Sequence, residues 1–219
     1  MAEWLCSGLQ SRLRRFDSGF SLHDRLIMKS YKCINNQNFS FKHLSITPIR
    51  YEDRLKIMQW RNEQIYHLRQ SKKLTELDQN NYFENTLEKN FDEIEPKQIL
   101  FSFMEKTKCI GYGGFVNINW VDKRAEMSFL LDTSLKGEFD TYSYYFTNFI
   151  YLLKKVAFNE IGFNRIFTET YSFRKKHISI LEKNGFKLEG VMKEHIFMHK
   201  EKNYYDSLIH GSLKKNYEK

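Results

Sequence analysis

The side chains that could do chemistry in this sequence form no metal or nucleophile motif. No group of His, Cys, Asp and Glu residues has the spacing of metal ligands, and no Ser/His/Asp pattern is evident. A cluster of three cations, Arg174-Lys175-Lys176, is the more informative feature. The chain also carries a net charge of +8, which favours anionic partners. Both a nucleic acid and a phosphate-rich cofactor meet that description.

The residues around this cluster predict how it is positioned. Residues 166–170 alternate and are rich in β-prone side chains, as expected of a strand. After the basic turn, Ile178 and Leu181 recur three residues apart, which places them on one face of a helix. Gly185 suits the left-handed residue that ends a helix, and a new strand starts at Phe186. The order is therefore strand, basic turn, short helix, glycine, strand.

Similar patterns predict further elements along the chain. Strands are expected near residues 44–50, 98–105, 109–119, 124–131, 165–170, 186–197 and 204–213. Helices are expected near residues 52–62, 75–89, 141–159 and 173–184, the second with Thr75 as its N-cap. The run IGYGGF lies within a strand, where glycine often marks a bulge or a close backbone approach. Because a strand and not a helix follows it, this run is not a dinucleotide-binding fingerprint.

Length and composition indicate a single domain over residues 28–219. The chain has 219 residues, of which 41% are hydrophobic and 28% charged, and this is enough for one core. No apolar run approaches 18 residues, so neither a membrane span nor a membrane partner is expected. The three cysteines are scattered, which favours a reducing cytoplasm.

Residues 1–27 differ in character from the rest of the chain. Residues 9–16 combine arginines with apolar side chains, as in a basic targeting or membrane-surface helix, but nearby acidic residues disfavour a transit peptide. We prefer another hypothesis. Residues 8–10 and 15–18 can be encoded by triplets that resemble the anticodon and TΨC arms of a transfer-RNA gene. Translation would then start naturally at Met28, and the preceding residues would be an extension without a role in the fold.

The sequence resembles the GNAT family of acetyl-CoA-dependent N-acetyltransferases. The run LEKNGF at residues 181–186, followed by Glu189-Gly190, is similar to a family run, as are IGYGGF and the closing NYYDSLIHG. The resemblance covers roughly residues 46–213, and the most similar subgroup includes ribosomal-protein N-terminal and amino-sugar N-acetyltransferases. It implies an α/β (α+β) fold, with about seven strands in one mixed, mostly antiparallel sheet and about four flanking helices. Strands 124–131 and 165–170, joined by a helix, would run parallel.

The same resemblance implies where acetyl-CoA would bind. In the family, the strand that corresponds to residues 124–131 parts from its neighbour. The cofactor's pantetheine arm would pair there with the backbone of Phe129, Leu130 and Leu131. The following loop and helix N-terminus would hold the pyrophosphate through Lys136, Gly137, Phe139, Asp140 and Thr141. A further phosphate would be held by Arg174 or Lys175.

The loop of residues 136–141 departs from the family's pattern in ways that disfavour the binding of a pyrophosphate. Phe139 replaces the glycine that lets a phosphate approach closely, and Glu138 and Asp140 place carboxylates beside the expected anion. Both acids also suit the first turn of a helix, which gives them a structural explanation. The departure leaves a non-catalytic, GNAT-like binding module as an alternative function.

Acetylation of an amine needs a base for the amine, polarisation of the thioester carbonyl and a proton for the leaving thiolate. The resemblance makes Glu126 the candidate base, because related enzymes often carry a carboxylate at this position. In many members, the tyrosine that protonates the thiolate stands at the position where this chain has Leu181. Tyr205 is therefore the first candidate for the general acid in this chain, and Tyr171 is the second. The run Trp60-Arg61-Asn62 resembles the acceptor side of amino-sugar members.

These features together predict the function. The expected activity is transfer of acetyl from acetyl-CoA to a primary amine, with a free or nucleotide-linked amino sugar as acceptor. A protein N-terminus is the alternative acceptor. Nucleic-acid binding ranks lowest, because the basic residues are spread and not arranged in a stripe. No metal is expected, and the protein would be a monomer or a homodimer.

Overall fold

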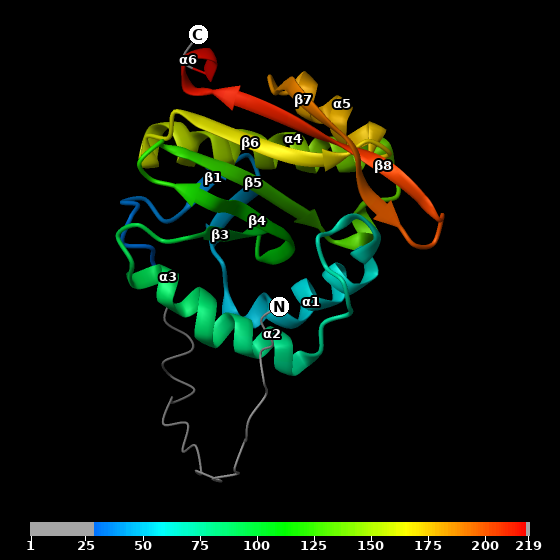
Figure 1. Ribbon diagram of the computed structural model, residues 1–219. Helices are drawn as coiled ribbons and strands as arrows, with labels where there is room; N and C mark the ends of the chain where they lie inside the picture. Colours follow the sequence, from blue (N-terminus) through cyan, green and yellow to red (C-terminus); the bar gives the residue numbers. More distant parts are fainter. Residues whose placement is uncertain (1–28, 218–219) are drawn as a thin grey trace, which may run out of the picture.

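Eight strands form a single mixed sheet in the computed structural model, which describes residues 29–217 (Figure 1). Across the sheet their order is β1-β2-β3-β4-β5-β6-β8-β7. The bounds are Phe39–Phe41 (β1), Leu44–Pro48 (β2), Ile99–Glu105 (β3), Lys108–Asn119 (β4), Arg124–Leu131 (β5), Arg165–Tyr171 (β6), Lys187–Met198 (β7) and Asn203–Leu213 (β8). Among the described strands, only β5 and β6 pair in parallel. This confirms the predicted helical crossover between them.

Helices cover the sheet on both sides. The α-helices are α1 (Arg54–Glu63), α2 (Glu76–Tyr82), α3 (Glu88–Asp92), α4 (Phe139–Lys155), α5 (Lys175–Lys183) and α6 (Lys214–Tyr217). Short 3-10 and π-helical turns are η2 (Tyr51–Asp53), η3 (Ile65–His67), η4 (Phe83–Leu87), η5 (Thr133–Leu135) and η6 (Val156–Ile161). In Figure 1, α4 lies behind the strands, whereas α2 and α3 lie in front of and below them. Within residues 29–217, no helix is both long and apolar enough to cross a lipid bilayer.

One part of the core lies between the sheet and α4, and another is covered by α1 and the segment from α2 to α3. The central strand β3 is buried along almost its whole length, because both of its faces are covered. Aromatic rings from the strands contact rings from the helix. The ring centroids of Phe103 and Phe149 are 5.1 Å apart, and those of the stacked Phe129 and Phe146 are 4.7 Å apart. The spacing of Phe146 and Phe149, three residues apart, puts both rings on the face of α4 that the sheet covers.

The predicted elements agree with the structure apart from a few boundaries. Strand β1 is not predicted, because three residues are too few to show an alternating pattern. The helix predicted at 75–89 continues through η4 to Asp92, and its capping box of Thr75 and Asp78 is confirmed. Helix α4 begins at Phe139 and not at 141, because the extended residue Glu138 is its N-cap. The predicted extension, residues 1–27, lies outside the described residues.

Strands β5 and β6 stay paired only over the first three residues of each. The pairs are Arg124 with Arg165, Ala125 with Ile166, and Glu126 with Phe167. On its other edge, β5 remains paired with β4 as far as its last residue. Residues 127–131 therefore keep one backbone edge without a strand partner. Glu126 lies where the two strands part.

Gly113 lets β4 approach β5 closely. A Cβ atom at this position would lie 2.2 Å from the backbone oxygen of Ser128, so any larger residue would displace the backbone of β5. This confirms the close approach predicted for the glycine-rich run.

Candidate active site

A cavity of about 270 Å³ opens where β5 and β6 part. Residues 126–130 of β5 and 168–171 of β6 form two of its walls. Half of the remaining lining comes from the region of α1 and η3 and from the start of α5, with Arg61, His67, Leu68, Arg69, Arg174 and His177. The other half comes from α2, β3, β4, α4 and the loop before β3, with Tyr82, Gln98, Leu100, Tyr112, Val116 and Phe146. The cavity therefore combines residues predicted from the sequence with several that the sequence did not reveal.

Glu126 lines this cavity, and two side chains hold its carboxylate. Arg69 donates to Glu126 Oε1 at 2.7 Å and to Oε2 at 3.2 Å. Asn117 Nδ2 donates to Oε2 at 2.7 Å. Asn117 can reach it because β4 is bulged: the pairing with β5 breaks after Val116, and Asn117 has a φ of 49°. The candidate base is thus oriented by neighbours and still faces the cavity.

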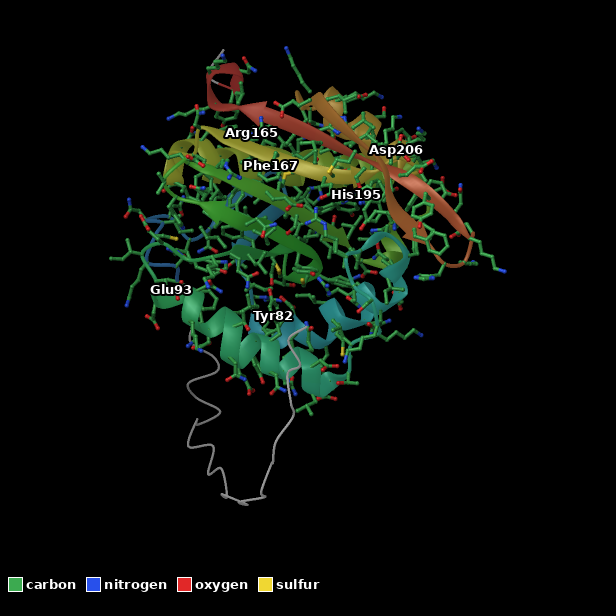
Figure 2. The ribbon with its side chains drawn as sticks, viewed as in Figure 1. Tyr82, Glu93, Arg165, Phe167, His195 and Asp206 are labelled. Carbon is green, nitrogen blue, oxygen red and sulfur yellow. The ribbon has the colours of Figure 1, made fainter. Side chains whose placement is uncertain are left out.

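Arg69 also connects β5 to β6. Its Nη2 atom donates to Glu169 Oε2 at 2.7 Å as well as to Glu126. Glu169 lies in turn 3.7 Å from Nε2 of His195, which comes from β7 and is labelled in Figure 2. Sequence reasoning missed Arg69 because it lies in a basic loop without periodicity, 57 and 100 residues from its two partners. No local sequence signal points to this group.

The three residues predicted to bind the acceptor have different surroundings. Trp60 is 4% exposed and belongs to the core. Asn62 holds the chain before α2, because its side chain bonds both the N–H and the carbonyl of Leu74. Arg61 lines the cavity, and its Nη1 donates to the hydroxyl of Tyr112 at 2.7 Å. Of the three, Arg61 is therefore the one that a ligand in the cavity would meet.

The two candidate proton donors also differ. Tyr205 lies on β8 with its ring 5.2 Å from that of Phe173, and it does not line the cavity. Tyr171, at the end of β6, is buried and lines the cavity. Burial raises the pKa of the Tyr171 hydroxyl. A phenol that keeps its proton until a strong base appears beside it suits a general acid.

The predicted phosphate-binding lysine is bound to other parts of the chain. The Lys136 ammonium donates to Gln64 Oε1 at 3.0 Å, to the Tyr66 hydroxyl at 2.7 Å and to His67 Nε2 at 2.9 Å. Burial, together with the charge of Arg174, lowers the pKa of Lys136 to about 8. The amide of Gln64 also donates to the carbonyl of Leu131, so η3 is tied to both the loop and the end of β5.

The rest of this loop is more open. Gly137, Glu138 and Asp140 are exposed, whereas Phe139 and Thr141 are half-buried. Glu138 makes no side-chain hydrogen bond to the start of α4. Because the first backbone N–H groups of a helix have no partner within it, an anion can approach the N-terminus of α4.

The border of the cavity near α5 is electropositive. His177 stacks on Phe146 with ring centroids 4.3 Å apart, and its Nδ1 bonds the Tyr142 hydroxyl at 2.7 Å. Burial and the charge of Arg174 lower the pKa of His177, and they lower that of His67 to about 2. Both histidines are consequently neutral at pH 7. An anion bound here would offset the charge of Arg174, which is the smaller cause of these pKa shifts after burial.

Some of the remaining residues predicted to bind the cofactor line the cavity, and others do not. Phe129 and Leu130 line the cavity, and Leu131 does not. Because the Phe129 ring is stacked in the core, its backbone is the part that a ligand would contact. At the start of α5, Arg174 lines the cavity, whereas Lys175 is exposed at the surface. Searched over residues 29–217, the structure has no group of three or more His, Cys, Asp or Glu side chains that could hold a metal ion.

Comparison with known proteins gives the same fold. A family model described as an acetyltransferase (GNAT) domain matches residues 46–209. The structure of spermidine N-acetyltransferase from Vibrio cholerae in complex with CoA and spermine superposes with a TM-score of 0.70 at 16% identity, over 81% of this chain and 99% of that one. A probable acetyltransferase (GNAT family) from Chromobacterium violaceum ATCC 12472 has a TM-score of 0.66 at 14% identity, over 97% and 100% of the two chains. At such identities, the two structures show a shared fold.

Proposed function

The chain belongs to the GNAT acetyltransferase family, and from this premise we propose that acetyl-CoA and a primary amine react in the cavity between β5 and β6. Membership of this family supports acetyl-CoA-dependent N-acetyltransferase activity for the protein. One observation carries the location of the reaction. Glu126 lines the cavity at the point where β5 and β6 cease to pair.

The chain's own groups fit acetyl-CoA in this location. Residues 127–130 offer a backbone edge that has no strand partner, which suits the amide groups of a pantetheine arm. The N-terminus of α4 is open to an anion, and Arg174 adds a cation at the border of the cavity. The exposed Glu138 and Asp140 are screened by solvent, so they weaken a phosphate contact without preventing it.

The residues of the cavity would divide the chemistry as follows. Glu126 would take the proton from the acceptor's ammonium, directly or through a water molecule. The freed amine would then attack the thioester carbonyl, and the nitrogen would lose its second proton as the amide forms and the carbon–sulfur bond breaks. This second proton would replace the one that the general acid gives to the leaving thiolate. The leaving thiolate needs one proton, which Tyr171 would supply from the end of β6. Tyr205 remains the alternative donor, although it would have to act from outside the cavity.

The charges of the lining narrow the class of acceptor. Three arginines (Arg61, Arg69 and Arg174) and two glutamates (Glu126 and Glu169) face the cavity. A polycation such as a polyamine would meet repulsion from the arginines. An acceptor with a single amine and neutral or anionic groups elsewhere suits this lining better. We therefore favour an amino sugar, including a nucleotide-linked one, and the subgroup of amino-sugar and ribosomal-protein N-acetyltransferases.

An acceptor screen tests this function. The purified protein is given acetyl-CoA with amino sugars, nucleotide-linked amino sugars, N-terminal peptides or spermidine, and the release of free thiol is followed. Amino sugars should be turned over, and E126Q should reduce kcat by roughly 10²- to 10⁴-fold, the usual contribution of a general base. R124Q, at a surface residue paired with Asp122, is the matched control. Turnover of spermidine alone would refute the choice of acceptor.

A non-catalytic binding module is the second candidate, and one observation favours it. The Lys136 ammonium already has three partners within the chain, so it is not free for a phosphate. Titration of the protein with acetyl-CoA separates the candidates. Saturable binding with thiol release supports the enzyme, whereas an inactive module whose loop is closed to the cofactor should show no saturable binding.

The oligomeric state is a separate proposal. We propose a monomer or a homodimer. Light scattering coupled to size-exclusion chromatography measures the mass directly. A larger assembly would contradict this proposal.

A further inference from the structure

Arg69 bridges two carboxylates that face each other across the parting of β5 and β6. Its Nη2 atom lies 2.7 Å from Glu126 Oε1 and 2.7 Å from Glu169 Oε2, so one nitrogen holds both. The two glutamate side chains are only 11% and 16% exposed, whereas that of Arg69 is 49% exposed. The carboxylates thus belong to the walls of the cavity, and the cation enters from the surface.

This arrangement needs a cation between the carboxylates. Two like charges that share a partly buried site repel each other more strongly than they would in water. With Arg69 in place, the three side chains carry a formal charge of −1, and without it they would carry −2. His195 Nε2, 3.7 Å from Glu169, is a further ionisable group at this point, and the Tyr171 hydroxyl is another, since Arg69 and both glutamates act on it electrostatically. The charge balance requires a cation, but it does not require a guanidinium.

We propose that Arg69 occupies the subsite for the acceptor's ammonium, and that the acceptor displaces it to bind between Glu126 and Glu169. The inference rests on the proposed function, which puts the reacting amine beside Glu126. An alkylammonium has three N–H donors and is more compact than a guanidinium. It can donate to both carboxylates and give up one proton to Glu126.

The position of Arg69 in the chain allows this exchange. It lies two residues after η3, in the stretch before α2 that has no regular secondary structure. Its guanidinium can therefore withdraw without breaking a helix or a strand. Arg69 acts as a tethered competitor, since every acceptor must displace a cation that is always present at high local concentration. It is a specificity-determining residue that excludes weakly bound amines.

Kinetics of R69A test the exchange. Removal of the competitor should lower the KM for the amine by about tenfold and leave kcat close to wild type. Methylguanidinium chloride should inhibit R69A competitively against the amine, because it refills the subsite, and it should inhibit wild type much less. R124Q should behave as wild type in both assays. A raised KM, or a lower kcat at unchanged KM, would overturn the proposal and make Arg69 a residue that only positions Glu126.

Thermal unfolding tests the subsite without any acetyl transfer. Methylguanidinium should raise the Tm of R69A, but it should leave unchanged the Tm of wild type and of R69A/E126Q/E169Q. R69Q serves as a second variant if R69A folds poorly. If methylguanidinium stabilises R69A but the protein acetylates no amine, the cation subsite is supported and the proposed function is refuted. No stabilisation of R69A or R69Q would overturn the subsite itself.

Discussion

Neutralising the two acids at the start of α4 should tighten acetyl-CoA binding. Glu138 is the N-cap of the helix and Asp140 lies in its first turn, and both side chains are exposed. If the N-terminus of α4 holds the pyrophosphate, these carboxylates lie beside a strongly anionic ligand. The double variant E138Q/D140N keeps the size of both side chains and removes two negative charges.

The size of the effect follows from exposure and charge. Because both acids are exposed, a dielectric constant of about 80 applies, and one pair of unit charges about 8 Å apart is worth about 0.5 kcal/mol. Two carboxylates acting on about two phosphate charges give roughly 2 kcal/mol before screening. Salt at about 0.15 M reduces this to about 0.8 kcal/mol, or about fourfold in Kd. At about 0.01 M salt it is about 1.6 kcal/mol, or about fifteenfold.

Isothermal titration of acetyl-CoA at low and physiological salt measures this difference. E93Q/E95Q is the matched control, because it removes two exposed negative charges from the loop between α3 and β3. The wild-type and control Kd values should agree, and the α4 variant should bind more tightly at low salt. Equal affinity of all three proteins at low salt, with the fold intact, would refute the assignment of this loop to the cofactor.

Three further predictions follow from other features of the structure. The pKa of His67 is lowered to about 2, so at this position only the unfolded chain binds a proton below pH 6.5. In urea unfolding, H67Q should lose about 1.4 kcal/mol less stability than wild type between pH 7.5 and 5.5, and buried His177 should still cause a loss in both proteins. G113A should destabilise the protein by about 3 kcal/mol in urea, since its Cβ would overlap β5, whereas G190A, with open space around its Cβ, should stay within about 0.5 kcal/mol of wild type. Y171F should reduce kcat by about a hundredfold and Y205F should leave it nearly unchanged, because Tyr171 lines the cavity and Tyr205 does not; the opposite ranking would assign the proton to Tyr205.

Local signals in the sequence were sufficient for most of the fold. The predicted N-cap at Thr75 is present, and because Asp78 lies three residues further on, the two side chains complete a capping box. Gly185 has a φ of 79°, as expected of the left-handed residue that ends a helix. The parallel pairing of β5 with β6 could be predicted as well, since a helix between two strands of one sheet requires it.

The candidate site was harder to predict, because its contacts join distant residues. The position of Glu126 at the parting of two strands came from the family resemblance, but its partner Arg69 is 57 residues away in an irregular loop. The ammonium of Lys136 turns toward η3, about 70 residues back along the chain, and no pattern near Lys136 indicates this. Trp60 and Arg61 are adjacent in sequence, and a helix necessarily directs such neighbours to different faces.

The short parallel junction also affects how the protein unfolds. Three residue pairs join the part of the sheet from β1 to β5 to the part formed by β6, β8 and β7, and α4 packs against β1, β2, β5 and α5 across that junction. Because so few strand pairs cross the junction, the packing of α4 supplies much of the connection between the two parts. A ligand that contacts both walls of the cavity adds interactions that neither part makes alone. Occupancy of the cavity would then make unfolding more nearly all-or-none.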